Sequence, residues 1–183
     1  AQVIVTEVDP VKAVEAHMDG YQVMPMLEAA RRGEFFVTCT GDTKVITGPH
    51  FDAMNDGAIL CNAGHFDVEV DVHCLQDHDP AHHEVRHDIE EYAWNGKRLY
   101  VLGEGRLVNL ACADGHPVEI MDLTFALQAL SAEYLVKHRE SLPHELIGVP
   151  EAIDDMAARA FLASRDLSID ALTDEQKAYL GSY

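Results

Sequence analysis

The chain has 183 residues and carries 13 Lys and Arg against 32 Asp and Glu, a formal net charge of −19. This length suits one domain, or one domain with an appended arm, and excludes a large multidomain protein. Such an acidic molecule repels nucleic acid and anionic membranes, so we expect neither as a partner. Acidic residues spread along the whole chain also suit solubility in concentrated salt, which suggests a halophilic source.

The cysteines and the apolar runs indicate where the protein works. No apolar run reaches the roughly 18 residues of a membrane span, and no basic stretch followed by an apolar one opens the chain. The cysteines show no C-x-x-C spacing, which fits reduced thiols in a cytosolic protein. We therefore expect a soluble, cytoplasmic protein whose four thiols are free: Cys39, Cys61, Cys74 and Cys112.

The first half of the chain alternates between short apolar strands and short helices. Runs of β-branched and apolar residues without alternation are typical of strands buried in a parallel sheet. We predict strands over residues 3–8, 21–23, 35–38 and 58–62, with helices over 11–18, 26–30 and 49–54. This order predicts an α/β fold with a Rossmann-like parallel sheet.

The pattern changes to period two between residues 85 and 101, and Asn95-Gly96 in its middle is a strong signal for a hairpin turn. We predict an antiparallel β ribbon at residues 83–102 and place it in a first domain of residues 1–112.

The remaining residues, 113–183, are expected to form a C-terminal helical segment. Apolar residues recur at helical spacing from Pro117 to about His138, which predicts one long helix. A further helix is predicted over residues 153–162, and a short helical turn begins at Leu172.

Residues that follow strands are the first candidates for a ligand site, because ligands of open α/β sheets bind outside the carboxyl ends of the strands. Glu7, Thr40 and Gly64 occupy such positions. An acidic residue after the second strand of a dinucleotide fold accepts hydrogen bonds from both ribose hydroxyls of NAD and repels the 2′-phosphate of NADP. Glu7 therefore predicts NAD, with a solvated loop carboxylate as the alternative.

The Gly-rich loop G-x-G-x-x-G, which should precede such a strand by about 20 residues, does not occur ahead of Glu7. We expect a Rossmann domain whose first βα unit is missing from this chain.

The run His83-Glu84-Val85-Arg86-His87 matches the zinc-protease pattern H-E-x-x-H. That pattern requires both histidines on one helical face, whereas period two favours a strand. We expect no metal site, and a zinc protease acting through His83, Glu84 and His87 is a remote alternative. The neighbouring His-rich stretch could also offer ligands to a soft divalent metal.

Four blocks of sequence, collinear along the chain, resemble the adenosylhomocysteinase (S-adenosyl-L-homocysteine hydrolase) family. The resemblance runs through nearly the whole chain and is weakest at residues 77–87. It implies the NAD-binding, C-terminal part of a homotetrameric enzyme that reversibly hydrolyses S-adenosyl-L-homocysteine to adenosine and L-homocysteine through a 3′-keto intermediate. The blocks are Val5-Thr6-Glu7-Val8-Asp9-Pro10, Cys61-Asn62-Ala63-Gly64-His65-Phe66-Asp67, Glu104-Gly105-Arg106-Leu107-Val108-Asn109-Leu110 and Gly115-His116-Pro117.

The resemblance also implies residue roles around the cofactor and the substrate. In cofactor binding, Glu7 is expected to hold the adenosine ribose of NAD, with Lys12 near that ribose. The segment that begins at Thr38 passes beside the cofactor, and Thr40 is its residue in direct contact with NAD. Asn109 orients the nicotinamide carboxamide, a role that suits a side chain able both to donate and to accept. The resemblance places Ala63, Gly64 and His65 at the nicotinamide, and His65 with Phe66 as a gate to the pocket. His116 is also expected at the cofactor, and His65, His116 and Met121 near the substrate. His65 and His116 are the expected catalytic residues.

The family's substrate-binding half, with its acid–base Asp and Lys, has no counterpart in this chain. We therefore do not expect the chain alone to catalyse the reaction, and a catalytically silent NAD-binding regulatory module is the alternative. Lys12 stands where many members have Asn or Cys, and Asp114 replaces an apolar residue, so the polarity of the pocket departs from the family pattern.

Overall fold

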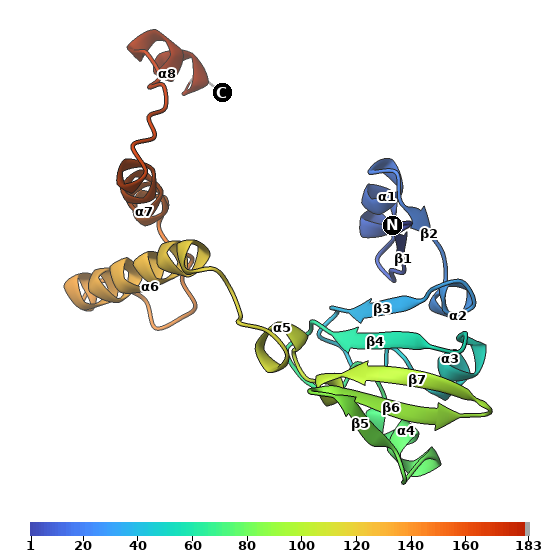
Figure 1. Cartoon of the computed structure of the whole chain (residues 1–183). Helices are drawn as coiled ribbons and strands as arrows, with labels where there is room; N and C mark the ends of the chain where they lie inside the picture. Colours follow the sequence, from blue (N-terminus) through green and yellow to red (C-terminus); the bar gives the residue numbers. More distant parts are fainter. Residues whose placement is uncertain (182–183) are drawn as a thin grey trace. The chain divides into compact units, whose positions relative to one another are not determined.

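A computed structural model of the chain describes residues 1–181 (Figure 1). Contacts divide the chain into two compact units, residues 1–115 and the residues from 116 onward. Within residues 1–181, the first unit holds all the strands and the second holds three helices.

The first unit is built on a mixed five-stranded sheet in the order β3-β4-β7-β6-β5. β3, β4 and β7 are parallel, whereas β6 runs antiparallel to both β7 and β5. The predicted α/β class with a parallel sheet is confirmed. The strand bounds are β3 Phe35–Thr38, β4 Ala58–Asn62, β5 His83–Arg86, β6 Ile89–Trp94 and β7 Lys97–Leu102.

The predicted ribbon is confirmed, and its turn lies at Asn95-Gly96. Both residues have positive φ angles, 49° and 85°, as a two-residue hairpin turn of this kind requires. The ribbon does not stand apart from the parallel strands, because β7 pairs in parallel with β4, with Leu99 beside Ala58. The hairpin therefore extends the sheet and places the end of β7 next to the end of β4.

One face of this sheet carries the hydrophobic core. Phe51 of α3 and Leu75 of α4 are fully buried against strand residues such as Leu60. Phe35 and Val37, on the opposite face of β3, are about half exposed, at 55% and 53%. The helices of this layer are α2 Met26–Ala30, α3 Gly48–Ala53 and α4 Val72–His78, of which α4 was not predicted from the sequence.

A second, smaller sheet pairs β1 (Ile4–Val5) in parallel with β2 (Gln22–Val23), and α1 (Pro10–Met18) connects them. The predicted strand over residues 3–8 was too long. The chain leaves the strand at Thr6 because the next residues prepare a helix start: the Asp9 side chain accepts a hydrogen bond from the Val11 N–H, and Pro10 begins α1. Glu7 consequently lies in the turn between β1 and α1.

The second unit contains α6 (Val118–His138), α7 (Glu151–Ser164) and α8 (Asp174–Leu180). The long helix predicted from Pro117 to about His138 is confirmed as α6. Helices α6 and α7 pack together, and Ile153 and Ala157 of α7 are buried. None of the helices among residues 1–181 combines the length and apolar character needed to cross a membrane.

Candidate functional site

Two loops leave the carboxyl ends of adjacent parallel strands and form the centre of the candidate site. Thr38 at the end of β3 pairs in register with Asn62 at the end of β4. The Thr38 Oγ1 donates to Asn62 Oδ1 at 3.1 Å, and both side chains are buried. The loops that carry Thr40 and Gly64 therefore begin side by side.

Asn62 fixes the second loop and links it to the segment after β7. Its Oδ1 accepts a hydrogen bond from the Gly64 N–H at 2.7 Å, and its Nδ2 donates to the carbonyls of Phe66 at 2.7 Å and Gly105 at 2.9 Å. Gly105 ends a 3₁₀ turn, η1 (Gly103–Gly105), which leads into α5 (Val108–Ala111). One buried amide thus holds the loop after β4 against the chain that leads to Asn109.

Glu69 holds the first loop. Its side chain is fully buried, and such a carboxyl group is tolerated only where its oxygens accept hydrogen bonds. Oε2 accepts from the Thr40 N–H at 2.9 Å and from the Thr40 hydroxyl at 2.7 Å, while Oε1 accepts from the Gly41 N–H at 2.7 Å. A Cβ atom on Gly64 would overlap Oε1, so glycine is required there.

Glu7 is exposed in the turn after β1. Its Oε1 accepts hydrogen bonds from the Val8 N–H at 2.7 Å and the Asp9 N–H at 3.0 Å. The bond from Asp9, then that from Val8, lowers the pKa of the Glu7 carboxyl below its ordinary 4.5, and nearby Lys12 adds to the effect. Glu7 is therefore ionised at neutral pH. The residues present fit an NAD ribose, since an anionic acceptor stands at the end of a parallel strand.

His65 and Phe66 lie together at the surface of the loop after β4. Their rings meet edge to face, with centroids 4.5 Å apart and planes at 89°, and Phe66 is 63% exposed. Ala63 is also exposed, whereas Gly64 between them is buried. The loop thus presents an aromatic pair to solvent beside the strand ends, the position in which the gate was predicted.

The remaining predicted residues lie farther along the chain. Asn109 is half-buried in α5, and its carbonyl accepts a hydrogen bond from the Gly115 N–H at 2.9 Å. His116 is exposed just before α6 and Met121 is half-buried in its first turn, so both belong to the second unit. The structure brings Thr38, Thr40 and residues 63–65 together, and every individual contact to NAD or substrate stays a prediction.

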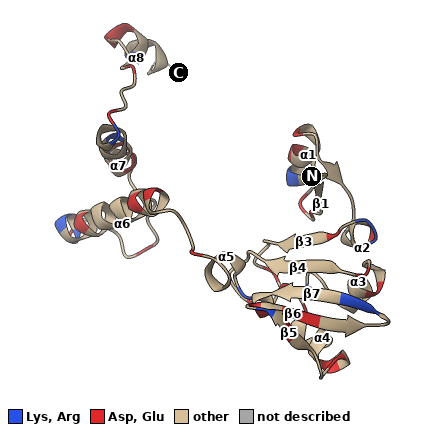
Figure 2. Ribbon diagram, viewed as in Figure 1, with Lys and Arg blue, Asp and Glu red and all other residues tan. Residues whose placement is uncertain are grey.

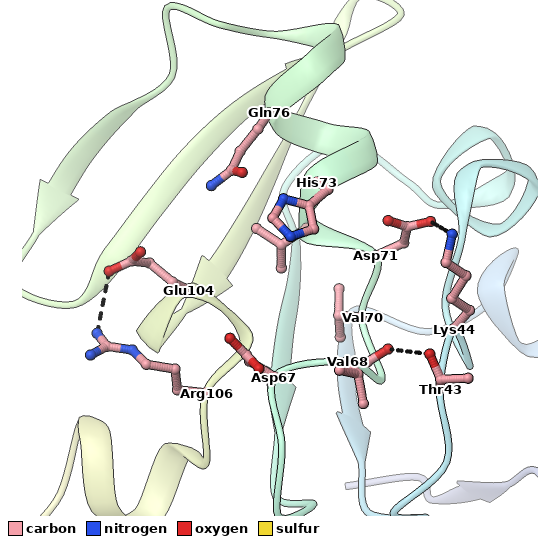
Figure 3. A pocket seen from close by; sticks show the side chains of 11 residues that line it. Thr43, Lys44, Asp67, Val68, Val70, Asp71, His73, Gln76, Glu104 and Arg106 are labelled. Atoms are coloured by element: carbon pink, nitrogen blue, oxygen red, sulfur yellow. Dashed lines mark hydrogen bonds and ion pairs between the residues drawn. The ribbon is translucent and has the colours of Figure 1, made fainter.

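A cavity of about 250 Å³ opens beside these loops, lined by residues around α4 and η1 (Figure 3). Its charged side chains largely pair with one another: Lys44 Nζ lies 3.3 Å from Asp71 Oδ2, and an Arg106 guanidinium nitrogen lies 3.3 Å from Glu104 Oε1. Among the charged residues of the chain, Asp and Glu outnumber Lys and Arg, 32 to 13 (Figure 2, red and blue). None of the predicted cofactor or substrate residues lines this cavity.

The segment that matches H-E-x-x-H forms a strand, which contradicts the zinc-protease alternative. His83 and Glu84 lie in β5, where they pair with Glu91 and Glu90 of β6. His87 follows the end of that strand with its side chain 94% exposed. The shared helical face that this motif needs does not form, and no group of three or more potential metal ligands is found within residues 1–181.

The roles of Asn62 and Glu69 in holding the two loops were not predicted from the sequence. Asn62 had a detectable signal, because it ends an otherwise apolar strand, and a polar residue buried there must find hydrogen-bond partners. Glu69 had none, because it lies in the alternating run Asp67-Val68-Glu69-Val70-Asp71. Only the paired loops show that both side chains are buried and hydrogen-bonded.

Comparison with known proteins gives the same assignment along the whole chain. Residues 1–115 match the family described as S-adenosyl-L-homocysteine hydrolase, NAD binding domain. An adenosylhomocysteinase of Aquifex aeolicus is 53% identical and aligns with 100% of this chain and 44% of its own length. That of Thermococcus kodakarensis is 54% identical, with the same coverage of both chains.

A related protein named S-inosyl-L-homocysteine hydrolase, from Methanosarcina acetivorans, is 50% identical over 98% of this chain and 43% of its own length. The chain thus spans less than half the length of the curated relatives it matches. With the match over residues 1–115 and the identities above, the chain belongs to the S-adenosyl-L-homocysteine hydrolase family and contains its NAD-binding domain.

Proposed function

We propose that this chain is the NAD-binding part of an enzyme that reversibly hydrolyses S-adenosyl-L-homocysteine to adenosine and L-homocysteine. The observation that carries the cofactor site is Glu7, an ionised carboxylate fixed by two backbone N–H groups at the end of β1. The identity of about half of all residues to adenosylhomocysteinases carries the reaction.

NAD, when bound, would accept hydride from the 3′ carbon of the substrate ribose, giving a 3′-keto intermediate. It would return the hydride after homocysteine has left C5′ by elimination and water has added in its place. Glu7 accepts hydrogen bonds from the NAD ribose hydroxyls and disfavours NADP by its charge. Lys12 lies near that ribose, and Thr38 and Thr40 lie beside the cofactor. Asn109 orients the carboxamide because an amide both donates and accepts hydrogen bonds.

The loop after β4 would serve the reacting end of the site. Ala63, Gly64 and His65 face the nicotinamide, and His65 with Phe66 closes the pocket against bulk water, which protects the oxidised intermediate. His116, which also touches the cofactor, and Met121 contact the nucleoside, with His65 and His116 the catalytic residues of this chain. The remaining acid and base groups are expected in the part of the relatives that this chain does not span.

We further propose that residues 1–112 bind NAD and that residues 113–183 lead back to a substrate domain. The protein acts in the cytoplasm as a homotetramer, in the S-adenosylmethionine cycle of one-carbon metabolism. Its acidic charge, −19, disfavours nucleic acid and membranes as partners.

The test uses the native protein and follows adenosine and homocysteine released from S-adenosyl-L-homocysteine. Product formation together with one tightly held NAD per protomer supports the proposal. NAD binding without product in either direction supports the regulatory module instead. Since one relative is named S-inosyl-L-homocysteine hydrolase, the same assay with S-inosyl-L-homocysteine shows which nucleobase is preferred.

A further inference from the structure

We propose that Glu69 is a positioning residue of the NAD site: its buried carboxyl group sets the shape of the loop that carries Thr40 before any cofactor binds. This inference rests on the proposed function. Glu69 itself does not touch the cofactor in this proposal. It acts through Thr40, Gly41 and Gly64, the residues against which its two oxygens lie.

The backbone of Glu69 is itself held firmly. The Ile46 N–H donates to the Glu69 carbonyl at 3.0 Å, the Lys44 N–H donates to the Val68 carbonyl at 2.8 Å, and Ile46 pairs with Val70 in a parallel bridge. Ile46 and Val70 are buried in the core. The carboxyl group therefore reaches the loops from a fixed base in the core.

Three hydrogen-bond donors of the loop at Thr40 are engaged by this carboxyl group. The N–H groups of Thr40 and Gly41 and the hydroxyl hydrogen of Thr40 all point to Glu69. The Thr40 Oγ1 also accepts a hydrogen bond from the Asp42 N–H at 3.0 Å. A hydroxyl group has one hydrogen and two lone pairs, so Thr40 retains one lone pair and its methyl group for a ligand.

The loop therefore presents a defined surface to NAD. The Thr40 and Gly41 amides cannot cradle the pyrophosphate, because Glu69 occupies them, and Thr40 meets the cofactor with its methyl group or as an acceptor. Gly64 adds the second loop to the same arrangement, since the Glu69 carboxyl fills the space where a side chain would stand. One side chain thus sets the spacing between the loops after β3 and β4.

The first test is Glu69→Gln in the native protein, with NAD affinity measured by titration. The NH₂ group of the new side-chain amide would face either the Gly41 N–H or the two donors of Thr40. Because a donor would then face a donor, the loop must move. We expect NAD to bind about tenfold more weakly or worse, the loss expected for one buried donor left unpaired. At saturating NAD the KM for substrate should change much less.

A matched control separates positioning from general loss of stability. Leu99→Val removes one methylene group from a fully buried residue of β7, which pairs with Ala58 of β4 and Tyr92 of β6. It should lower the unfolding temperature and leave NAD affinity unchanged while the protein is folded. Wild-type affinity in a folded Glu69→Gln variant would overturn the inference. Failure of the wild-type protein itself to bind NAD would instead overturn the proposed function.

A second measurement needs no variant and covers the case in which Glu69→Gln does not fold. Amide hydrogen exchange of the NAD-free native protein should show strong protection at Thr40 and Gly41, because Glu69 already holds both N–H groups. Fast exchange there without NAD, with protection only after NAD is added, would show that the cofactor shapes the loop and would overturn the inference.

Discussion

Gly64 lies directly over the carboxyl group of Glu69, so closely that a Cβ atom on Gly64 would overlap Oε1. The two residues lie near opposite ends of the loop after β4. Because Gly64 has no side chain, the Glu69 carboxyl group has room to reach Thr40 and Gly41 on the neighbouring loop. A glycine and a buried acid together thus determine how the loops at the strand ends fit.

The substitution Gly64→Ala should displace the Glu69 carboxyl group. We expect the unfolding free energy to fall by about 1–3 kcal/mol, as for other overpacked sites, and NAD binding to weaken. Urea denaturation and NAD titration measure the two effects. Gly48→Ala is the control, because its added Cβ would lie an ordinary 3.7 Å from Cys74 Sγ. Equal stability of both variants would contradict the packing at Gly64.

Glu7→Gln should weaken NAD binding about tenfold, because a neutral amide is a poorer acceptor for the ribose hydroxyls than a carboxylate. NADP should lose less affinity, since the repulsive charge is removed at the same time. Isothermal titration with both nucleotides measures the change in preference. Glu15→Gln, at an exposed position of α1, is the control and should bind NAD like the wild type. An unchanged ratio of NAD to NADP affinity would remove Glu7 from the site.

Asn62→Asp should destabilise the first unit by about 3 kcal/mol, because the carboxylate cannot donate to the carbonyls of Phe66 and Gly105 and stays buried. Asn55→Asp is a matched control: its amide is exposed and makes only a 3.4 Å bond to the Arg31 carbonyl. That change should cost less than about 1 kcal/mol. Urea denaturation distinguishes the two, and similar losses would argue against the special role of Asn62.

Asp56 should contribute to stability in a pH-dependent way. Hydrogen bonds from the Arg98 guanidinium, and then from its backbone N–H, lower the pKa of Asp56 from 3.8 to about 2. The pKa is lowered in the folded state, so the contribution is complete above pH 3.8 and is lost as pH falls toward about 2.

The difference in unfolding temperature between the wild type and Asp56→Asn should therefore be constant near neutral pH and shrink only in that acidic window. Thermal denaturation followed by circular dichroism measures it. Asp170→Asn, at an exposed position of the second unit, is the comparison. A difference that shrinks already near neutral pH would contradict the assignment to the Asp56–Arg98 pair.

The purified protein should hold far less than one equivalent of zinc, because His83 lies in a strand and His87 is exposed beyond its end. Elemental analysis after dialysis against a chelator measures this. NAD binding should survive the treatment. Stoichiometric zinc that is lost in a His83→Ala variant would restore the metal-site alternative.

Features that depend on local patterns could be predicted from the sequence. Unbroken apolar runs predicted β3 and β4, Asn95-Gly96 predicted the hairpin, and helical spacing predicted α6. Collinear blocks of residues predicted the family, which the comparisons show. These signals are local because periodicity, turn conformation and short motifs act within a few residues.

The way in which these elements join became visible in the folded chain. The fold pairs β7 in parallel with β4, shortens β1, and buries Asn62 and Glu69. Thr40 and Glu69 are 29 residues apart in the chain, so no local pattern predicts that one holds the other. A polar residue is stabilised in the interior only by the partners that folding brings to it, and those partners come from distant segments.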